Sequence, residues 1–170
     1  MKNRRRTIRC LLYAAELLIL SLLSGTPFLL PEVFGGKPLL LLAAALGFAA
    51  AEEETAALIL GAVCGALTDL LSYGGVGYYA IALTLVCFAL SRLFATRLRA
   101  NWLTLAVLSL AAVPLLIGVY FVLFRLTADI PDPGTLFVGH YLSRMALTWL
   151  FAVPLYVLNR LIVRGFPIRD

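Results

Sequence analysis

The residues with the most potential for chemistry lie in one apolar stretch, where Gly61, Gly65 and Asp69 follow each other at intervals of four. At about 100° per residue, this spacing places all three on one slowly drifting face of a helix. A carboxylate surrounded by hydrocarbon costs a few kcal/mol or more unless it has a partner or a wet cavity. The stretch therefore predicts a smooth, small-residue helix face that ends in one acid.

Arg144 is the cation that we expect at a similar depth, in a later apolar segment. Pairing Asp69 with Arg144 would remove two otherwise unpaired charges from lipid. Two alternatives stay open: one or both side chains extend to the membrane surface, or the two form a substrate or ion site. His140 lies four residues before Arg144 on the same face. A single His without a second ligand at metal spacing is expected to form hydrogen bonds at the interface.

Composition identifies the environment of these residues. The 170-residue chain is 62% hydrophobic and 14% charged, whereas soluble domains are roughly 45–50% apolar and about 25% charged. A membrane span needs about 20 apolar residues. We therefore expect an all-α integral membrane protein, with residues 1–170 forming a single polytopic domain. The net charge of +5 is not read as a nucleic-acid footprint, because basic residues cluster at segment ends.

Six apolar segments can be drawn, and the charge distribution sets their number. They cover residues 11–30, 39–51, 55–72, 76–94, 102–124 and 136–158. Segment 39–51 is short and would suit a re-entrant element. With six spans and a cytoplasmic N-terminus, however, nearly all basic residues face inward, and only Lys37 and Arg125 face outward. The positive-inside rule therefore favours six spans with both termini cytoplasmic.

The remaining acids are expected near the cytoplasmic side. Residues 52–54 are three consecutive glutamates just before the third apolar segment, where their charge meets the positive end of the helix dipole. We interpret them as a solvated helix cap, with a docking site for a basic partner as the alternative. Glu16 lies within reach of the inner basic belt, so we expect it at the interface or paired with an arginine there.

The sequence predicts no enzyme and no cofactor. No nucleophile elbow, zinc-protease, phosphate-loop or dinucleotide motif is present, and no second carboxylate accompanies Asp69 for acid–base work. Cys10, Cys64 and Cys87 are far apart, so neither a metal site nor a disulfide framework is indicated.

The segment from Gly61 to Leu83, GAVCGALTDLLSYGGVGYYAIAL, resembles the family of rod shape-determining protein MreD. The matching features are the glycine-spaced helix, the Asp-Leu-Leu-Ser step, a short turn, and Gly77 opening the next span. Length, six spans and short cytoplasmic ends also fit. The resemblance covers the whole chain in layout, but only about residues 61–83 in motif.

The resemblance implies a non-enzymatic scaffold of the cell-elongation complex in the bacterial inner membrane, which supports cell shape and side-wall peptidoglycan synthesis. The implied partners are an MreC-like bitopic protein, actin-like MreB, the glycosyltransferase RodA and a penicillin-binding transpeptidase. Small residues let helices approach closely in lipid, so small-residue faces are our candidate interfaces; the alternative is that they pack within the monomer. The structural or partner-binding candidates are Gly61, Gly65, Asp69, Gly77 and Arg144, together with the alanines and glycine of residues 43–51.

MreD proteins are also similar to the six-helix S component of energy-coupling-factor vitamin transporters, which supplies the alternative function. A vitamin site would need aromatic and polar groups converging from the outer side. The residues that would form this outer pocket are Tyr73, Tyr78, Tyr79 and His140, with Asp69 and Arg144. A neighbouring gene for an MreC-like protein would favour the shape-determining function. The fold alone cannot separate the two.

Overall fold

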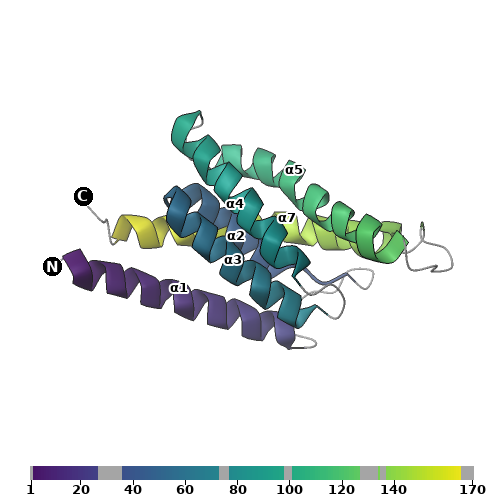
Figure 1. Cartoon of the computed structure of the whole chain (residues 1–170), viewed down its shortest axis with the longest axis horizontal. Coiled ribbons are helices and arrows are strands. Elements are labelled where there is room, and N and C mark those ends of the chain that lie inside the picture. Colours follow the sequence, from purple (N-terminus) through teal and green to yellow (C-terminus); the bar gives the residue numbers. More distant parts are fainter. Residues whose placement is uncertain are drawn as a thin grey trace.

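The computed structural model describes residues 2–26, 36–72, 77–97, 101–126, 134 and 137–165 (Figure 1). The elements in these residues are helical, which confirms the predicted class. They are α1 (Lys2–Gly25), α2 (Leu40–Ala51), α3 (Glu54–Leu71), α4 (Tyr78–Thr96), α5 (Trp102–Phe121), the π-helical turns η1 (Val122–Leu126) and η2 (Phe137–Tyr141), and α7 (Leu142–Gly165).

Within the described residues, five helices are long and apolar enough to cross a membrane. They are α1 from Thr7, α3, α4, α5 continued to Phe124, and η2 joined to α7. The predicted span 39–51 corresponds to α2, which has only 12 residues. At about 1.5 Å per residue it measures about 18 Å, well short of the ~30 Å hydrocarbon core. Five membrane-length helices thus stand where the sequence predicted six spans.

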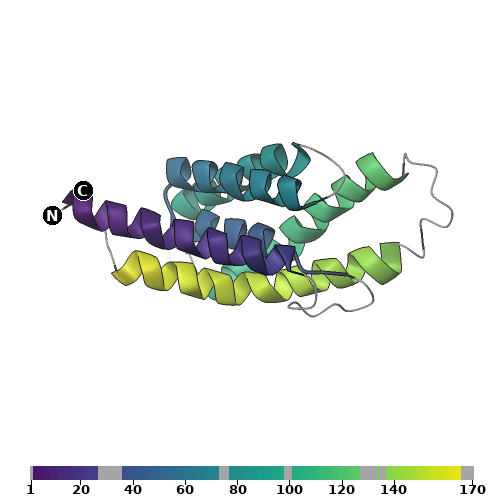
Figure 2. The same ribbon diagram turned by 90° about the horizontal axis from the view of Figure 1, so that it is seen from below.

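The short helix α2 forms the centre of the bundle. It contacts α1, α3, α4, α5 and α7, and Figure 2 shows it enclosed by longer helices. Its residues from Leu40 to Ala50 are all buried. Alanine and glycine make up much of this sequence, and small side chains let surrounding helices approach closely. The small-residue surface predicted on this segment therefore packs inside the monomer.

Residues 36–39, before α2, are non-helical and lie against the first turns of α7. A Cβ on Gly36 would come within 2.6 Å of the carbonyl oxygen of His140, and the Leu39 N–H donates to Thr148 Oγ1 at 2.9 Å. Further along, Gly47 packs against Tyr156. The segment therefore runs in the same direction as α7. In a membrane protein, non-helical backbone is tolerated within the hydrocarbon region where it is buried in protein.

The first turn of α1 and the last turn of α7 lie at the same end of the bundle in both views (Figures 1 and 2). We call this the terminal end. At the opposite end, called the distal end, α1 and α3 finish and α4 and η2 begin. The sequence-predicted candidates Asp69, Tyr78, Tyr79, His140 and Arg144 belong to elements that meet at the distal end.

Candidate functional site

Asp69 caps the helix that follows it. Its Oδ1 accepts a hydrogen bond from the Tyr79 N–H at 3.1 Å, and its Oδ2 accepts one from the Ala80 N–H at 2.8 Å. These donors are in the first turn of α4, where backbone N–H groups have no partner within the helix. The preceding Gly77 has no side chain to cap with, so the carboxylate arrives from α3 instead. Two hydrogen bonds and the positive end of the α4 dipole offset the cost of burying this acid.

Gly77 stands immediately before α4 in a backbone conformation that favours glycine. Its φ of 94° lies in the left-handed region, which glycine adopts without the clash that a Cβ would cause. α4 begins at the next residue. The prediction that Gly77 opens the next helix is confirmed, whereas residues 74–76 of the predicted turn lie outside the described residues.

The glycine face of α3 is occupied by α4. A Cβ on Gly61 would lie 2.9 Å from Cys87 Cβ, and one on Gly65 would lie 2.5 Å from Ala80 Cα. The two helices can approach this closely only because both positions are glycine. The structural interpretation of Gly61 and Gly65 therefore applies, and this face is not free for a partner helix.

The predicted ion pair between Asp69 and Arg144 is wrong. In the described part of the chain, the salt bridge found joins Arg9 to Glu52, and Asp69 bonds to backbone N–H groups ten and eleven residues further along. Similar depth suggested the pair, but depth does not determine which way each side chain points around its helix. The nearby helix N-terminus satisfies the acid instead.

Arg144 and Tyr79 are left with unsatisfied hydrogen-bonding atoms. The Nε of Arg144 and the hydroxyl of Tyr79 are both buried and have no hydrogen-bond partner. Tyr79 is only 1% exposed, whereas Arg144 as a whole is half-buried. The Tyr79 ring stacks on Tyr120, with centroids 5.2 Å apart. Tyr79 and Arg144, which the sequence singled out, thus each have one unsatisfied donor atom at the distal end.

The other residues of the predicted outer pocket have separate roles. Tyr78 donates its hydroxyl to the Leu116 carbonyl on α5 at 2.8 Å, and its ring contacts Tyr120 and Phe124. His140 lies in η2 beside Tyr141, with ring centroids 5.5 Å apart. Tyr73 lies outside the described residues. The structure thus assembles an aromatic cluster at the distal end.

Two π-helical turns, η1 and η2, border this cluster. Phe121, immediately before η1, contacts Phe137 and Tyr141 of η2 at centroid distances of 5.0 and 4.9 Å. Single π-helical turns are rare and frequently occur at functional sites. The apolar pattern of α5 and α7 gave no signal for them, because a one-residue widening of a helix leaves the composition unchanged.

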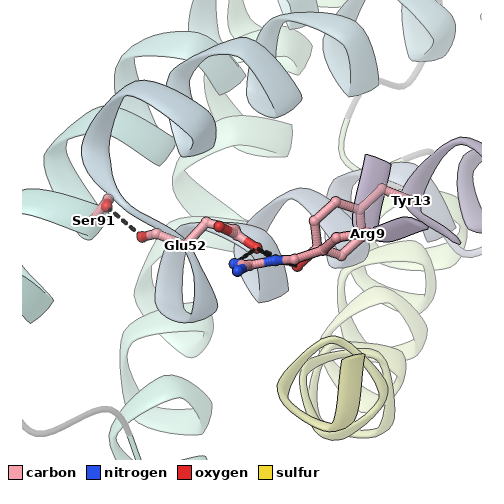
Figure 3. Close-up of polar contacts among 4 residues, drawn as sticks. All are labelled: Arg9, Tyr13, Glu52 and Ser91. Carbon is pink, nitrogen blue, oxygen red and sulfur yellow. Dashed lines mark hydrogen bonds and ion pairs between the residues drawn. The ribbon is translucent and has the colours of Figure 1, made fainter. Parts of the chain in front are cut away.

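A second polar cluster, at the terminal end, was missed from the sequence (Figure 3). Arg9 donates through Nε to Glu52 Oε1 at 2.8 Å, and through Nη2 to the same oxygen. The Tyr13 hydroxyl also donates to Glu52 Oε1, while Ser91 Oγ donates to the Glu52 carbonyl at 3.0 Å. The cluster ties α1 to the end of α2 and to α4.

Glu52 therefore does not fit the expected solvated cap, although Glu53 and Glu54 do stand at the start of α3. The spacing of four between Arg9 and Tyr13 was the available signal, because it places both side chains on one face of α1. The chain distance of 43 residues between Arg9 and Glu52 could not be bridged by such local reasoning.

Glu16 is buried, and neither of its carboxylate oxygens has a hydrogen-bond partner. The expected arginine partner is therefore wrong, since the buried Arg9 of α1 bonds to Glu52; the interfacial position stays a prediction. Among the described residues, no group of three or more His, Cys, Asp or Glu residues is arranged to hold a metal ion, and the three cysteines are free.

Comparison with known protein families identifies the family of this chain. The family model described as rod shape-determining protein MreD matches residues 4–165. The chain belongs to this family. The family resemblance inferred from residues 61–83 is thereby confirmed over nearly the whole chain. Membership in the MreD family implies a membrane protein with a role in determining rod shape. No curated protein and no solved structure gives a significant match.

Proposed function

We propose that this MreD family protein is a non-enzymatic scaffold of the bacterial cell-elongation complex. It binds an MreC-like single-span protein in the inner membrane and so supports side-wall peptidoglycan synthesis together with MreB, RodA and a penicillin-binding transpeptidase. The observation that carries the proposal is the family match over residues 4–165. The same match favours shape determination over the alternative of a vitamin-transporter S component.

The packing supports a lipid-facing interface for this partner. Gly61, Gly65 and the alanines of α2 are used inside the bundle. Large apolar side chains instead cover the outside of the long helices, including Leu18 on α1 and Leu150 on α7. The partner helix therefore packs against such side chains, in place of the small-residue faces expected from the sequence.

The scaffold has six crossings in this proposal, with both termini cytoplasmic. Residues 36–39 and α2 together account for the sixth: three extended steps of about 3.3 Å added to the ~18 Å helix give about 28 Å. Placing the first turn of α1 and the last turn of α7 at one end requires an even number of crossings (Figure 1). The arginines near both chain ends favour the cytoplasm for that end.

Reporter fusions test this topology. Fusions after Glu53 and Thr96 are expected to report the cytoplasm, and a fusion after Gly75 the outside. An exterior signal after Glu53 would contradict a sixth crossing at α2.

Copurification tests the function. The full-length chain, tagged and extracted from its native membrane in mild detergent, is expected to enrich an MreC-like single-span protein, identified by mass spectrometry. A mock extract of untagged cells is the control. Enrichment of a coupling ATPase and its membrane subunit instead would refute the scaffold and support the transporter alternative.

A further inference from the structure

Glu16 lies at the midpoint of an apolar, membrane-length helix. The apolar part of α1 runs from Thr7 to Gly25, so Glu16 is about 14 Å along the helix from either limit. A glutamate side chain is too short to cover that distance to the membrane surface. An ionised side chain is most costly at the centre of a span, so this position requires that the charge be neutralised.

The inward face of α1 encloses this side chain. Glu16 is only 7% exposed. Tyr13 and Leu20, three residues before it and four after it, share this face and are buried too. The Tyr13 ring packs edge-on against Phe48 of α2, with centroids 5.0 Å apart. Packing on either side therefore keeps the carboxyl group inside the bundle.

Both carboxylate oxygens of Glu16 are buried and have no hydrogen-bond partner. The bundle does supply donors to its other enclosed acids. Asp69 accepts two backbone N–H groups, and the Glu52 side chain accepts from Arg9. Among the acids whose side chains are enclosed in the described helices, Glu16 thus stands apart, because no donor stabilises its charge.

The helices that pack against α1, namely α2, α3 and α7, bring no counter-charge to Glu16. α2 has no ionisable side chain. The ionisable residues of the other two helices and of the apolar part of α1 are Glu54, Cys64 and Asp69, then Arg144, Tyr156, Arg160 and Arg164, and finally Arg9, Cys10 and Tyr13. None of them donates a hydrogen bond to Glu16. Arg9, the nearest cation along the chain, bonds to Glu52.

The chemistry of an enclosed, unpartnered carboxyl group determines its ligand. Burial without donors disfavours the ionised form, and such a group is neutralised instead. A proton does this alone, whereas a metal ion needs several ligands. Within the described residues, no group of three or more His, Cys, Asp or Glu is arranged to hold a metal ion. The surroundings of Glu16 therefore suit a proton.

We propose that Glu16 is a proton-binding site in the middle of the bundle, and that α1 docks with this proton bound. The proton is taken from bulk water as α1 packs against its neighbours, and it returns to water when the helix separates from them. In this proposal Glu16 lies deeper than the interfacial position predicted from the sequence. The site is independent of the scaffold proposal, because it rests on the burial of one unpartnered acid.

The bound proton makes the stability depend on pH. A glutamate in the unfolded chain is ionised at neutral pH, so the folded state binds one more proton than the unfolded state. Stability falls with rising pH wherever the folded state binds more protons. Raising the pH therefore loosens the docking of α1.

Infrared spectroscopy of the full-length protein tests the bound proton, because the C=O stretch of a protonated carboxyl group is separate from the absorption of carboxylates and amides. The detergent is neutral and free of esters, whose carbonyl groups absorb in the same region. We expect this band at neutral pH in the wild type and in Glu53→Gln, which removes an exposed carboxylate, and its loss in Glu16→Gln. A wild type without the band, or an equally intense band in Glu16→Gln, would overturn the proposal.

Unfolding at different pH values gives a second readout. Relative to Glu16→Gln, the unfolding equilibrium constant of the wild type should rise by up to about tenfold per pH unit as the pH increases through neutrality. Parallel pH dependences would overturn the proposal. A stabilisation by sodium ions that Glu16→Gln abolishes would overturn it too, since a metal ion would then neutralise the carboxylate.

A second variant covers the case in which Glu16→Gln does not fold. Glu16→Met fills a similar space without a polar hydrogen-bonding group, and it then serves as the reference in both measurements. A protonated carboxyl group without partners is replaceable by such a side chain. If neither variant folds, the carboxyl group has a specific partner and the proposal is overturned.

Discussion

Asp69 on α3 accepts a hydrogen bond from the backbone N–H of Tyr79 at the start of α4, at 3.1 Å. Its second oxygen accepts the Ala80 N–H at 2.8 Å. One carboxylate thus replaces the side-chain cap that Gly77 cannot provide, and joins two neighbouring helices at the distal end. The acid that was expected to bridge distant helices instead organises a local hairpin.

Replacing Asp69 tests this cap. Asp69→Ala leaves two N–H groups of α4 unsatisfied and is expected to lower the free energy of unfolding by about 1–3 kcal/mol. Asp69→Asn retains one acceptor oxygen and should lose roughly half as much. Unfolding in detergent measures both. Equal losses in the two variants, or no loss in either, would contradict the cap.

Combining Asp69→Ala with Arg144→Ala tests whether the two charges interact. Because Asp69 and Arg144 share no contact, the effects of Asp69→Ala and Arg144→Ala on unfolding should add within about 0.5 kcal/mol in the double variant. A coupling clearly above that level would show that the two charges interact after all.

Gly65→Ala tests the close approach of α3 and α4. The new Cβ would lie 2.5 Å from Ala80 Cα, so the helices must separate, and we expect a loss of about 1–3 kcal/mol or more. Gly118→Ala on α5 is the matched control, because nothing lies within 4 Å of its Cβ position. That change should be neutral or stabilise by up to about 1 kcal/mol. Similar melting temperatures for the two variants would refute the packing argument.

The cluster at the terminal end predicts coupling between Arg9 and Glu52. Their side chains are both buried, so removing one leaves the other charge unpaired and costs more than removing both. Arg9→Gln and Glu52→Gln should each destabilise, and the double variant should recover about 1 kcal/mol or more. Glu53→Gln is the control and should change stability by less than about 0.5 kcal/mol, since Glu53 makes no side-chain cap. Strict additivity for Arg9 and Glu52 would exclude the buried pair.

Replacing Glu16 is expected to have the opposite effect on stability to replacing Glu52. Both of its oxygens are buried without partners, so Glu16→Gln removes an acid that no hydrogen bond stabilises while keeping the side-chain shape. We expect the unfolding free energy at neutral pH to stay within about 0.5 kcal/mol or to rise. A loss like that of Glu52→Gln would reveal a specific interaction of the carboxyl group.

Local sequence patterns predicted the α3–α4 hairpin well. The features involved, namely Gly61, Gly65, Asp69 and Gly77, lie close together in the sequence. Their spacing along the chain therefore determines their relative positions in space. The predicted segments 55–72 and 76–94 match α3 and α4 within about two residues at each end, and the family resemblance came from the same stretch.

Relationships between distant segments could not be predicted in this way. Hydrophobicity identifies residues 39–51 as apolar, but it cannot tell a lipid-facing helix from the enclosed α2. Depth along the helices placed Asp69 near Arg144, yet the direction of each side chain around its helix depends on packing. The same reason hid the bond between Arg9 and Glu52.

Site-specific photo-crosslinking in native membranes tests the central claim, that this MreD family protein binds a single-span partner through its lipid-facing surface. A photoreactive residue is placed at one exposed position on each long helix: Leu18, Val63, Leu85, Leu110 and Leu150. The buried Leu46 on α2 is the control. We predict crosslinks to an MreC-like protein from one or two neighbouring helices and none from Leu46. No crosslink to such a protein from any exposed position would contradict the claim.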